Sequence, residues 1–265
     1  MNLKLVALQT LLLLPTVVRA PFERWIKGTK IDGGPIFIVG APHSGTTIML
    51  ALLDSHSRLY AIPGSTRVGP SRLTPILPPL FDFLTLGHGK HRWVEKTNDN
   101  ISHLDTLLSM SPEARVIIML RDGRDVANSL FERLGSLEYG ARRWISDNIT
   151  GRPHWDHPRV RVIKYEDLIA DSAGTLAEIL EFVGEEFEEQ CLQHHLRPRR
   201  YLAAKVRQPP DATGTNFEVH RNWQINQPLF DGRGRWRKTL SSEQLSVLSE
   251  EGVDELLAEY GYPPD

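Results

Sequence analysis

The feature that most constrains the fold of this chain is a short apolar run followed by a glycine-containing turn and a helical pattern. Residues 35–40, PIFIVG, have the length and composition of a strand that is covered on both faces. The turn at 40–47, GAPHSGTT, leads into TTIMLALLD, whose apolar positions suit a helix packed on a sheet. Such a turn presents backbone N–H groups and a helix N-terminus to an anion. The motif therefore predicts a phosphate-binding loop in an α/β fold.

The rest of the sequence repeats this alternation of strands and helices. Further strands are expected at 91–95, 115–120 and 159–165, each followed by a helical pattern. The order βαβα predicts a P-loop-like three-layer α/β fold, in which a central parallel sheet is flanked by helices.

Two long stretches depart from the alternation. Between residues 64 and 89, four prolines should break any long element. Residues 196–238 are expected to form a binding loop or lid, because idle loops of that length are uncommon. After them, Ser241 and Gln244 have the capping-box spacing that starts a terminal helix.

Composition indicates one compact domain with an anionic ligand. A chain of 265 residues with 40% apolar and 24% charged residues can bury a sizeable core. Its formal charge of −2 is unevenly spread, since residues 165–190 are acidic and residues 196–238 carry ten basic residues against three acidic ones. The basic stretch favours an anionic ligand, and we expect no nucleic-acid partner. The single cysteine, Cys191, is expected to be a buried apolar residue rather than part of a disulfide.

Residues 1–30 are expected to form an apolar segment ahead of the main domain at 31–265. Polar residues and a proline interrupt the run at 3–18, which is shorter than a membrane span needs. A helix that packs on the domain or touches a membrane through residues 1–20 is favoured over a cleaved secretory signal. A cytoplasmic protein, at most membrane-associated, is therefore expected rather than a secreted or lumenal one.

The turn lacks the lysine of nucleoside triphosphatases. Thr46 stands where that lysine would reach the β- and γ-phosphates, so the loop suits a single terminal phosphate or a sulfate ester. The residues expected to contact this group are Pro42, His43, Ser44, Gly45, Thr46 and Thr47.

At this point the sequence resembles the sulfotransferases that use 3′-phosphoadenosine 5′-phosphosulfate (PAPS). APHSGTT is similar to their 5′-phosphosulfate loop, although His43 stands where Lys or Arg is usual. RDGRDVANS at 121–129 matches their 3′-phosphate motif, which implies phosphate contacts from Arg121 and Ser129. An Arg at a strand end and a hydroxyl two turns into the next helix can face one phosphate.

A third segment extends the resemblance, which covers roughly residues 33 to 262. GRGRWRK at 232–238 is similar to a Gly-Arg-Trp-Arg segment of bacterial-type members that closes over the 3′-phosphate. The residues implied in nucleotide contact are Gly234, Arg235, Trp236 and Arg237.

The resemblance implies transfer of a sulfuryl group to a hydroxyl or amine by in-line displacement. Lys96 matches the family lysine that contacts the phosphosulfate, and His43 could stabilise the leaving oxygen as a cation or an acid. If His43 acts in that way, the rate should fall with rising pH. Candidates for the base are Glu95, His103 and His220.

The acceptor stays open between a sugar, a lipid, a peptide and a small metabolite. Residues 53–70 resemble protein-tyrosine sulfotransferases, but Ser65 stands where that branch has a Glu, which puts tyrosine in doubt. Arg67 is a candidate for holding the donor or the acceptor. No metal is expected, because no Cys or carboxylate has ligand spacing around His194 and His195.

Two other functions remain as alternatives. A nucleotide or small-molecule kinase would need ATP and Mg²⁺, and Thr46 at the lysine position argues against it. A non-catalytic PAPS-binding relative would bind the donor without turnover, and it is suggested by His43 and Ser65, which replace family residues.

Overall fold

The structure is a computed structural model that describes residues 31–72, 74–198 and 223–264. The predictions for residues 1–30 and for His220 lie outside the described residues.

The strands are β1 (Ile36–Val39), β2 (Leu59–Ala61), β3 (Arg92–Lys96), β4 (Arg115–Leu120) and β5 (Val160–Lys164). The α-helices are α3 (Thr46–Asp54), α4 (Leu77–Gly87), α5 (Leu104–Ser109), α6 (Gly123–Leu134), α7 (Leu137–Gly151), α8 (Tyr165–Ala170), α9 (Ser172–Val183), α11 (Trp236–Thr239), α12 (Ser242–Glu250) and α13 (Val253–Glu259). The short 3₁₀ helices are η1 (Asn98–His103), η2 (Arg152–His154), η3 (Glu189–Cys191) and η4 (His194–Leu196).

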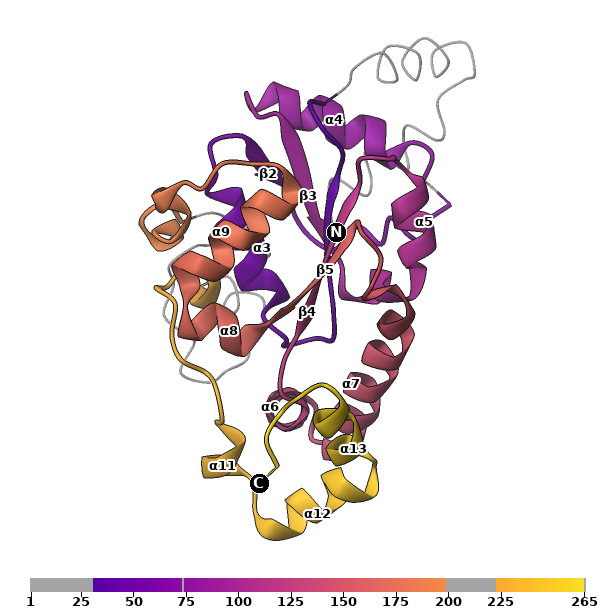
Figure 1. Cartoon of the computed structure of the whole chain (residues 1–265), viewed down its shortest axis with the longest axis vertical. Helices are drawn as coiled ribbons and strands as arrows, with labels where there is room; N and C mark the ends of the chain where they lie inside the picture. Colours follow the sequence, from indigo (N-terminus) through magenta and orange to yellow (C-terminus); the bar gives the residue numbers. More distant parts are fainter. Residues whose placement is uncertain (1–30, 73, 199–222, 265) are drawn as a thin grey trace.

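The five strands form one parallel sheet in the order β2-β3-β1-β4-β5 (Figure 1). The chain builds the β2-β3 half of the sheet after β1 and then crosses to the other side of β1 for β4 and β5. Open α/β sheets bind ligands beyond the carboxyl ends of their strands, at the point where the strand order reverses. Here that point lies between β1 and β4. The predicted P-loop-like fold with a central parallel sheet is confirmed.

Strand β1 forms the centre of the core because side chains on both of its faces are buried. Ile36 and Ile38 point to one face and Phe37 and Val39 to the other, and all four are 0% exposed. A strand buried on both faces has no polar side, which explains the continuous apolar run in the sequence. Burial of each such side chain contributes about 1.5 to 3 kcal/mol.

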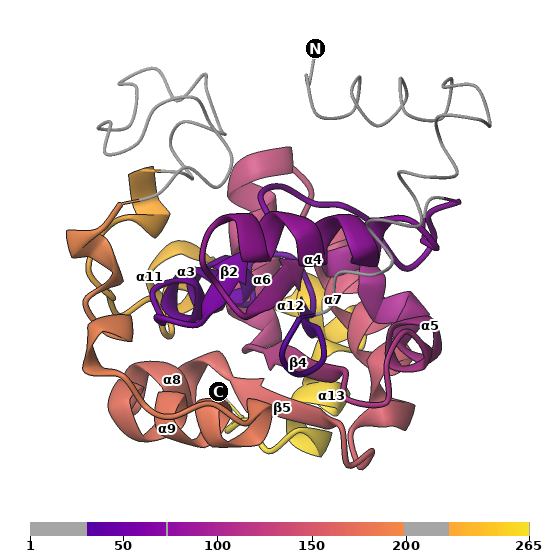
Figure 2. The ribbon, with the colours of Figure 1, turned by 90° about the horizontal axis from the view of Figure 1, so that it is seen from above.

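Helices cover both faces of the sheet. Helices α3, α8 and α9 pack on the face of Ile36 and Ile38, whereas α4 and α5 pack on the face of Phe37 and Val39. Figure 2 shows α4 and the α8–α9 pair on opposite sides of the molecule. A third cluster joins α6, α7, α12 and α13 around the fully buried Trp144.

The strands predicted near 92, 115 and 160 are confirmed, and so is the helix that begins at Thr46. The expectation that prolines break every long element between 64 and 89 is wrong, because α4 spans eleven residues there. Pro78 and Pro79 lie in the first turn of α4, where the backbone N–H groups have no intrahelical partner and proline costs little. The three-residue strand β2 was not predicted from the sequence.

The capping box at Ser241 and Gln244 is present and starts α12. The predicted single terminal helix is instead two helices, because Gly252 adopts a left-handed conformation with φ of 86° between α12 and α13. Cys191 is fully buried, as expected, and burial raises the pKa of its thiol to about 12. Within the described residues, no helix combines the length and apolar character needed to span a bilayer.

Replacing Gly40, the residue after β1, with alanine is expected to destabilise the protein by about 2 to 5 kcal/mol. Gly40 has φ of 133°, and an added Cβ would lie 2.3 Å from the carbonyl oxygen of Met119 in β4. The matched control is Gly64→Ala, since Gly64 has φ of 81° but no atom within 4 Å of an added Cβ. Urea denaturation measures the free energy of unfolding, and equal losses in the two variants would contradict the close contact between the loop and β4.

Candidate functional site

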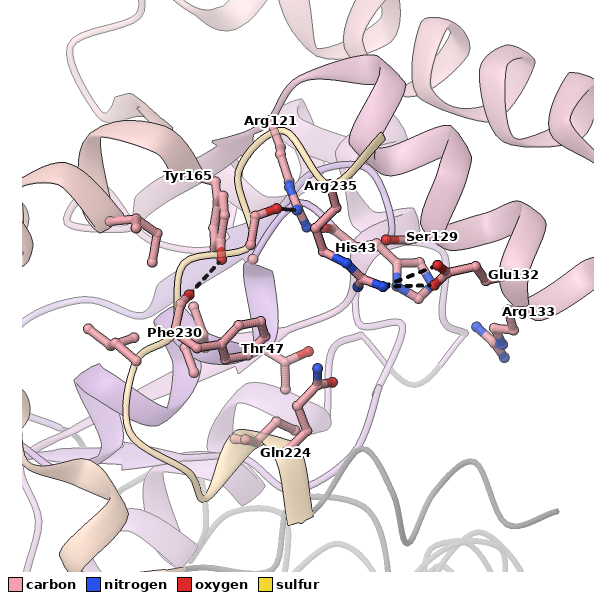
Figure 3. Close-up of a pocket in the computed structure, with 16 residues that line it drawn as sticks. His43, Thr47, Arg121, Ser129, Glu132, Arg133, Tyr165, Gln224, Phe230 and Arg235 are labelled. Atoms are coloured by element: carbon pink, nitrogen blue, oxygen red, sulfur yellow. Dashed lines mark hydrogen bonds and ion pairs between the residues drawn. The ribbon is translucent and has the colours of Figure 1, made fainter. Parts of the chain in front are cut away.

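A cavity of about 570 Å³ opens beyond the carboxyl ends of β1 and β4 (Figure 3). The loop after β1, the N-terminal turn of α3, helix α6, the start of α8 and residues 224–235 form its wall. The lining residues are His43, Gly45, Thr47, Ile48, Arg121, Ser129, Glu132, Arg133, Tyr165, Ile169, Gln224, Ile225, Leu229, Phe230, Gly232 and Arg235.

The loop between β1 and α3 is held in a left-handed conformation at two positions. His43 has φ of 68° and Gly45 has φ of 89°, and an added Cβ at Gly45 would lie 2.8 Å from the Tyr165 ring. Asn98 holds the loop from the β3 side, where its amide donates to the Gly40 carbonyl at 2.7 Å and to Thr46 Oγ1 at 3.2 Å. The Thr46 side chain therefore faces the sheet edge, and it does not line the cavity.

Arg121, directly after β4, ties three segments together. Its Nη1 donates to the His43 carbonyl at 3.0 Å, and its Nη2 donates to the Gly232 carbonyl. The guanidinium also lies 4.4 Å from the centre of the Tyr165 ring and 3.6 Å from the Asp125 carboxylate. Only 8% of Arg121 is exposed, so these contacts fix its position before any ligand is considered.

Two buried polar atoms at this loop have no hydrogen-bond partner among the described residues, Ser44 Oγ and Arg121 Nε. Buried polar groups are almost always paired, so two unpartnered donors next to the cavity indicate a site for an acceptor-rich ligand. The first turn of α3 adds backbone N–H groups and the positive end of its dipole. Together these groups fit a phosphate or sulfate ester.

The segment after residue 231 is anchored on Asp125 in α6. The Asp125 carboxylate, 1% exposed, accepts from the backbone N–H groups of Gly234 at 2.8 Å and Trp236 at 3.1 Å. Burial raises the pKa of Asp125. Trp236 itself is 1% exposed and packs under the Arg124 guanidinium at 4.2 Å, so its ring holds the segment on α6 rather than lining the cavity.

Two of the predicted basic residues in this segment differ in position. Arg235 lines the cavity and pairs with Glu132 across its mouth, whereas Arg237 packs on the outer side of the Trp236 ring at 4.3 Å. Gly234 has φ of 62° and gives the turn its shape.

One part of the cavity wall is apolar. Ile48, Ile169, Ile225, Leu229 and Phe230 line it. The Tyr165 ring adds an aromatic face to this part, and its hydroxyl donates to the Phe230 carbonyl at 3.3 Å. A flat apolar region beside cationic groups is the chemistry that a nucleotide base and its phosphates require.

The structure brings together six of the predicted site residues on the cavity wall: His43, Gly45, Thr47, Arg121, Ser129 and Arg235. Pro42 and Ser44 lie in the same loop, and Ser44 is fully buried behind it. Lys96 ends β3 opposite Ile38 of β1 and is 7% exposed, close to the loop but outside the lining set.

Glu95 lies away from the cavity, in the interior. Its carboxylate is 0% exposed and accepts from Thr66 Oγ1 at 2.8 Å, Thr97 Oγ1 at 2.5 Å and Asn100 Nδ2 at 3.0 Å. Burial raises the pKa of Glu95. The contacts make Glu95 the anchor of the loop at 65–69.

The other residues predicted to contact or deprotonate the acceptor, among those described, lie on or beside this loop. Ser65 and Arg67 are exposed, and Arg67 has φ of 50° and pairs with Asp99 at 3.0 Å. His103 is half-buried and packs against Gly69, since an added Cβ at Gly69 would lie 2.7 Å from His103 Cβ. This group belongs to the β3 side of the sheet edge, and the cavity lies on the β4 side.

Several lining residues were missed by the sequence reasoning. Tyr165 follows β5 directly, and the carboxyl-end rule that singled out Arg121 could have found it too. Glu132 and Arg133 follow Ser129 by three and four residues on one helix face, a signal available once α6 was expected. Residues 224–230 lie within the stretch at 196–238 that was expected to form a binding loop or lid, but no individual residue among them was singled out.

The fold and cavity define a three-layer α/β protein with an anion-binding loop at the switch point of its sheet. The sequence model described as the sulfotransferase family matches residues 35–77 and 79–189. The chain therefore belongs to the sulfotransferase family. The match does not extend to the segment that carries Arg235.

Curated relatives are distant. A putative protein-tyrosine sulfotransferase of Caenorhabditis briggsae is 28% identical over 196 residues, which are 60% of this chain and 69% of that protein. Protein-tyrosine sulfotransferase A of Caenorhabditis elegans is 23% identical, with 87% of this chain and 67% of that protein covered. An uncharacterized Aquifex aeolicus protein is 23% identical over 66% of this chain, which spans only 28% of that protein.

Solved structures agree on the fold. The sulfotransferase domain of a Synechococcus olefin synthase has a TM-score of 0.58 at 17% identity, with 89% of this chain and 97% of that domain covered. A mouse sulfotransferase in complex with PAP has a TM-score of 0.56 at 16% identity, with 89% and 92% covered.

Asp125→Ala is expected to lower the free energy of unfolding by about 1 to 3 kcal/mol, because two backbone N–H groups lose their buried acceptor. Hydrogen exchange at the amides of Gly234 and Trp236 should also become faster. The matched control is Asp231→Ala, since Asp231 pairs with Arg233 in the same segment but is exposed. Unchanged exchange in Asp125→Ala would contradict the anchoring role of this carboxylate.

Proposed function

We propose that this chain transfers a sulfuryl group from PAPS to a hydroxyl or amine of an acceptor. The observation that carries the proposal is a pair of buried donors with no hydrogen-bond partner among the described residues, Ser44 Oγ in the loop after β1 and Arg121 Nε at the end of β4, beside a cavity at the switch point. Membership of the sulfotransferase family supports the reaction type. The PAP complex of the mouse structure supports the choice of donor.

In this proposal, each part of the donor has its own region of the wall. The loop at 42–47 and the N-terminus of α3 hold the 5′-phosphosulfate. Arg121, Ser129 and Arg235 hold the 3′-phosphate, for which a guanidinium is well suited. The apolar wall and the Tyr165 ring hold the adenine.

The donor supplies the sulfuryl group and a phosphate leaving group. The helix N-terminus and the loop N–H groups stabilise the negative charge that develops on the departing oxygen, because they are already oriented toward it. His43 lies on the cavity wall where Lys or Arg is usual. It acts there as an additional hydrogen-bond donor to the departing oxygen. Lys96, at the adjacent strand end, supplies positive charge from the β3 side.

The acceptor must lose a proton. Glu95 is enclosed by its three partners, so it orients the loop at 65–69 and does not exchange protons with bound acceptor. His103, beside that loop, is the remaining described base candidate on the acceptor side. The acceptor class, whether sugar, lipid, peptide or small metabolite, is open.

A kinase is the less favoured function. Thr46 replaces the lysine that reaches the β- and γ-phosphates in nucleoside triphosphatases, and its hydroxyl accepts from Asn98 and does not line the cavity. A kinase would also require Mg²⁺, whereas the proposed reaction needs no metal.

Calorimetric titration with adenosine 3′,5′-bisphosphate tests the proposal. We expect micromolar or tighter binding that does not depend on Mg²⁺. Arg121→Ala should weaken it by about ten- to a hundredfold, because a hydrogen bond to a charged group contributes about 1.5 to 3 kcal/mol. The matched control is Arg161→Ala. Arg161 is a half-exposed arginine on the edge strand β5, where it pairs with Glu178 of α9.

A preference for ATP with Mg²⁺ would overturn the proposal in favour of a kinase. Tight binding of the bisphosphate without turnover on any acceptor would instead favour a non-catalytic relative. In that case His43→Lys, which restores the usual cation, should also fail to produce transfer.

A further inference from the structure

Helix α6 turns one face toward the cavity, and that face carries a carboxylate. Ser129, Glu132 and Arg133 line the cavity together, as expected for residues three and four apart on a helix. Figure 3 shows the Glu132 carboxylate beside Ser129 and pointing toward Arg235. Arg235 Nη2 lies 3.1 Å from Glu132 Oε1 and 3.4 Å from Oε2, so the pair joins α6 to the segment at 232–238.

A carboxylate is unexpected at this position. The surrounding wall presents a hydroxyl, three guanidiniums and a helix N-terminus, all of which favour an anionic ligand. Glu132 adds negative charge next to the place where such a ligand would lie. The pair is also about half exposed, at 45% for Glu132 and 46% for Arg235, and exposed pairs of this kind contribute little to stability. Folding therefore gives no reason for the carboxylate.

We propose that Glu132 sets how tightly the nucleotide is held and how fast it leaves, by competing with its 3′-phosphate for Arg235. The inference rests on the proposed function, because it assigns Arg235 and Ser129 to that phosphate. One guanidinium cannot give its best geometry to a carboxylate and a phosphate at the same time. Arg235 must turn from Glu132 toward the ligand, and the carboxylate then repels the phosphate at short range.

The consequence is a site that binds the bisphosphate product less tightly than its cations alone would allow. Release of product limits turnover in many enzymes, so a built-in competitor would favour a fast cycle. Glu132 acts through Arg235 and through charge, and it is a positioning residue rather than a catalytic one.

The test is titration of Glu132→Gln with adenosine 3′,5′-bisphosphate. Glutamine keeps the size of the side chain and removes the charge, and we expect binding about three- to tenfold tighter, with slower dissociation in stopped-flow measurements. Adenosine 5′-monophosphate lacks the 3′-phosphate, so its affinity should rise much less on the same substitution. The melting temperature should not change, because the pair is exposed.

The matched control is Glu178→Gln. Glu178 is 53% exposed and pairs with Arg161 at 3.0 Å, a similar ion pair outside the cavity, and its replacement should leave binding unchanged. Arg235→Ala should weaken binding of the bisphosphate. In the Arg235→Ala protein, adding Glu132→Gln should raise the affinity by less than it does in the wild-type protein, because the competition for Arg235 is gone.

Each result decides the inference. Weaker or unchanged binding in Glu132→Gln, or an equal gain for the monophosphate, would overturn it while leaving the proposed function intact if the wild-type protein binds the bisphosphate. Absence of bisphosphate binding in the wild-type protein would overturn the proposed function, and this inference with it.

Discussion

The Arg121 guanidinium is the interaction on which the rest of the site depends. It follows a central strand, and its two Nη atoms bind the carbonyls of His43 and Gly232, which are far apart in the sequence. Trp144 fixes the backbone below it by donating to the Arg121 carbonyl at 2.9 Å. Arg121 therefore links the loop after β1 to the segment at 232–238, and Tyr165 packs close to both as well. One side chain thus contacts two walls of the cavity.

Charge near the cavity is arranged in local pairs. Arg124 is paired with Asp122, Arg233 with Asp231 and Arg235 with Glu132. The Arg233 guanidinium, hydrogen-bonded to Asp231, lowers the pKa of that carboxyl to about 2. Such pairing places a carboxylate beside each of these cations. Two buried donors without a partner among the described residues, Ser44 Oγ and Arg121 Nε, lie in and beside the loop after β1.

The sequence predicted the elements whose residues are determined by local rules. The apolar run of β1 and the turn before Thr46 needed no partner to be recognised, and Arg121 followed from its place at a strand end. Residues 196–238 were expected to form a binding loop or lid, but the individual residues of the apolar wall could not be predicted, because residues 224–230 reach the site through contacts distant in sequence. Glu95 was expected to be a candidate base, yet Thr66, Thr97 and Asn100 enclose it, and only the fold reveals such burial.

Two non-glycine residues among those described have positive φ, His43 and Arg67. Such backbone costs about 1 to 3 kcal/mol and persists only where neighbours hold it. Arg121 holds His43, while Thr97 Oγ1 and Asp99 hold Arg67. His43 lies in the loop after β1 and is held from the end of β4, whereas Arg67 lies in the loop at 65–69 and is held from the end of β3. If the nucleotide occupies the β4 side, in-line displacement requires the acceptor to approach from the β3 side, where the strained loop at 65–69 lies.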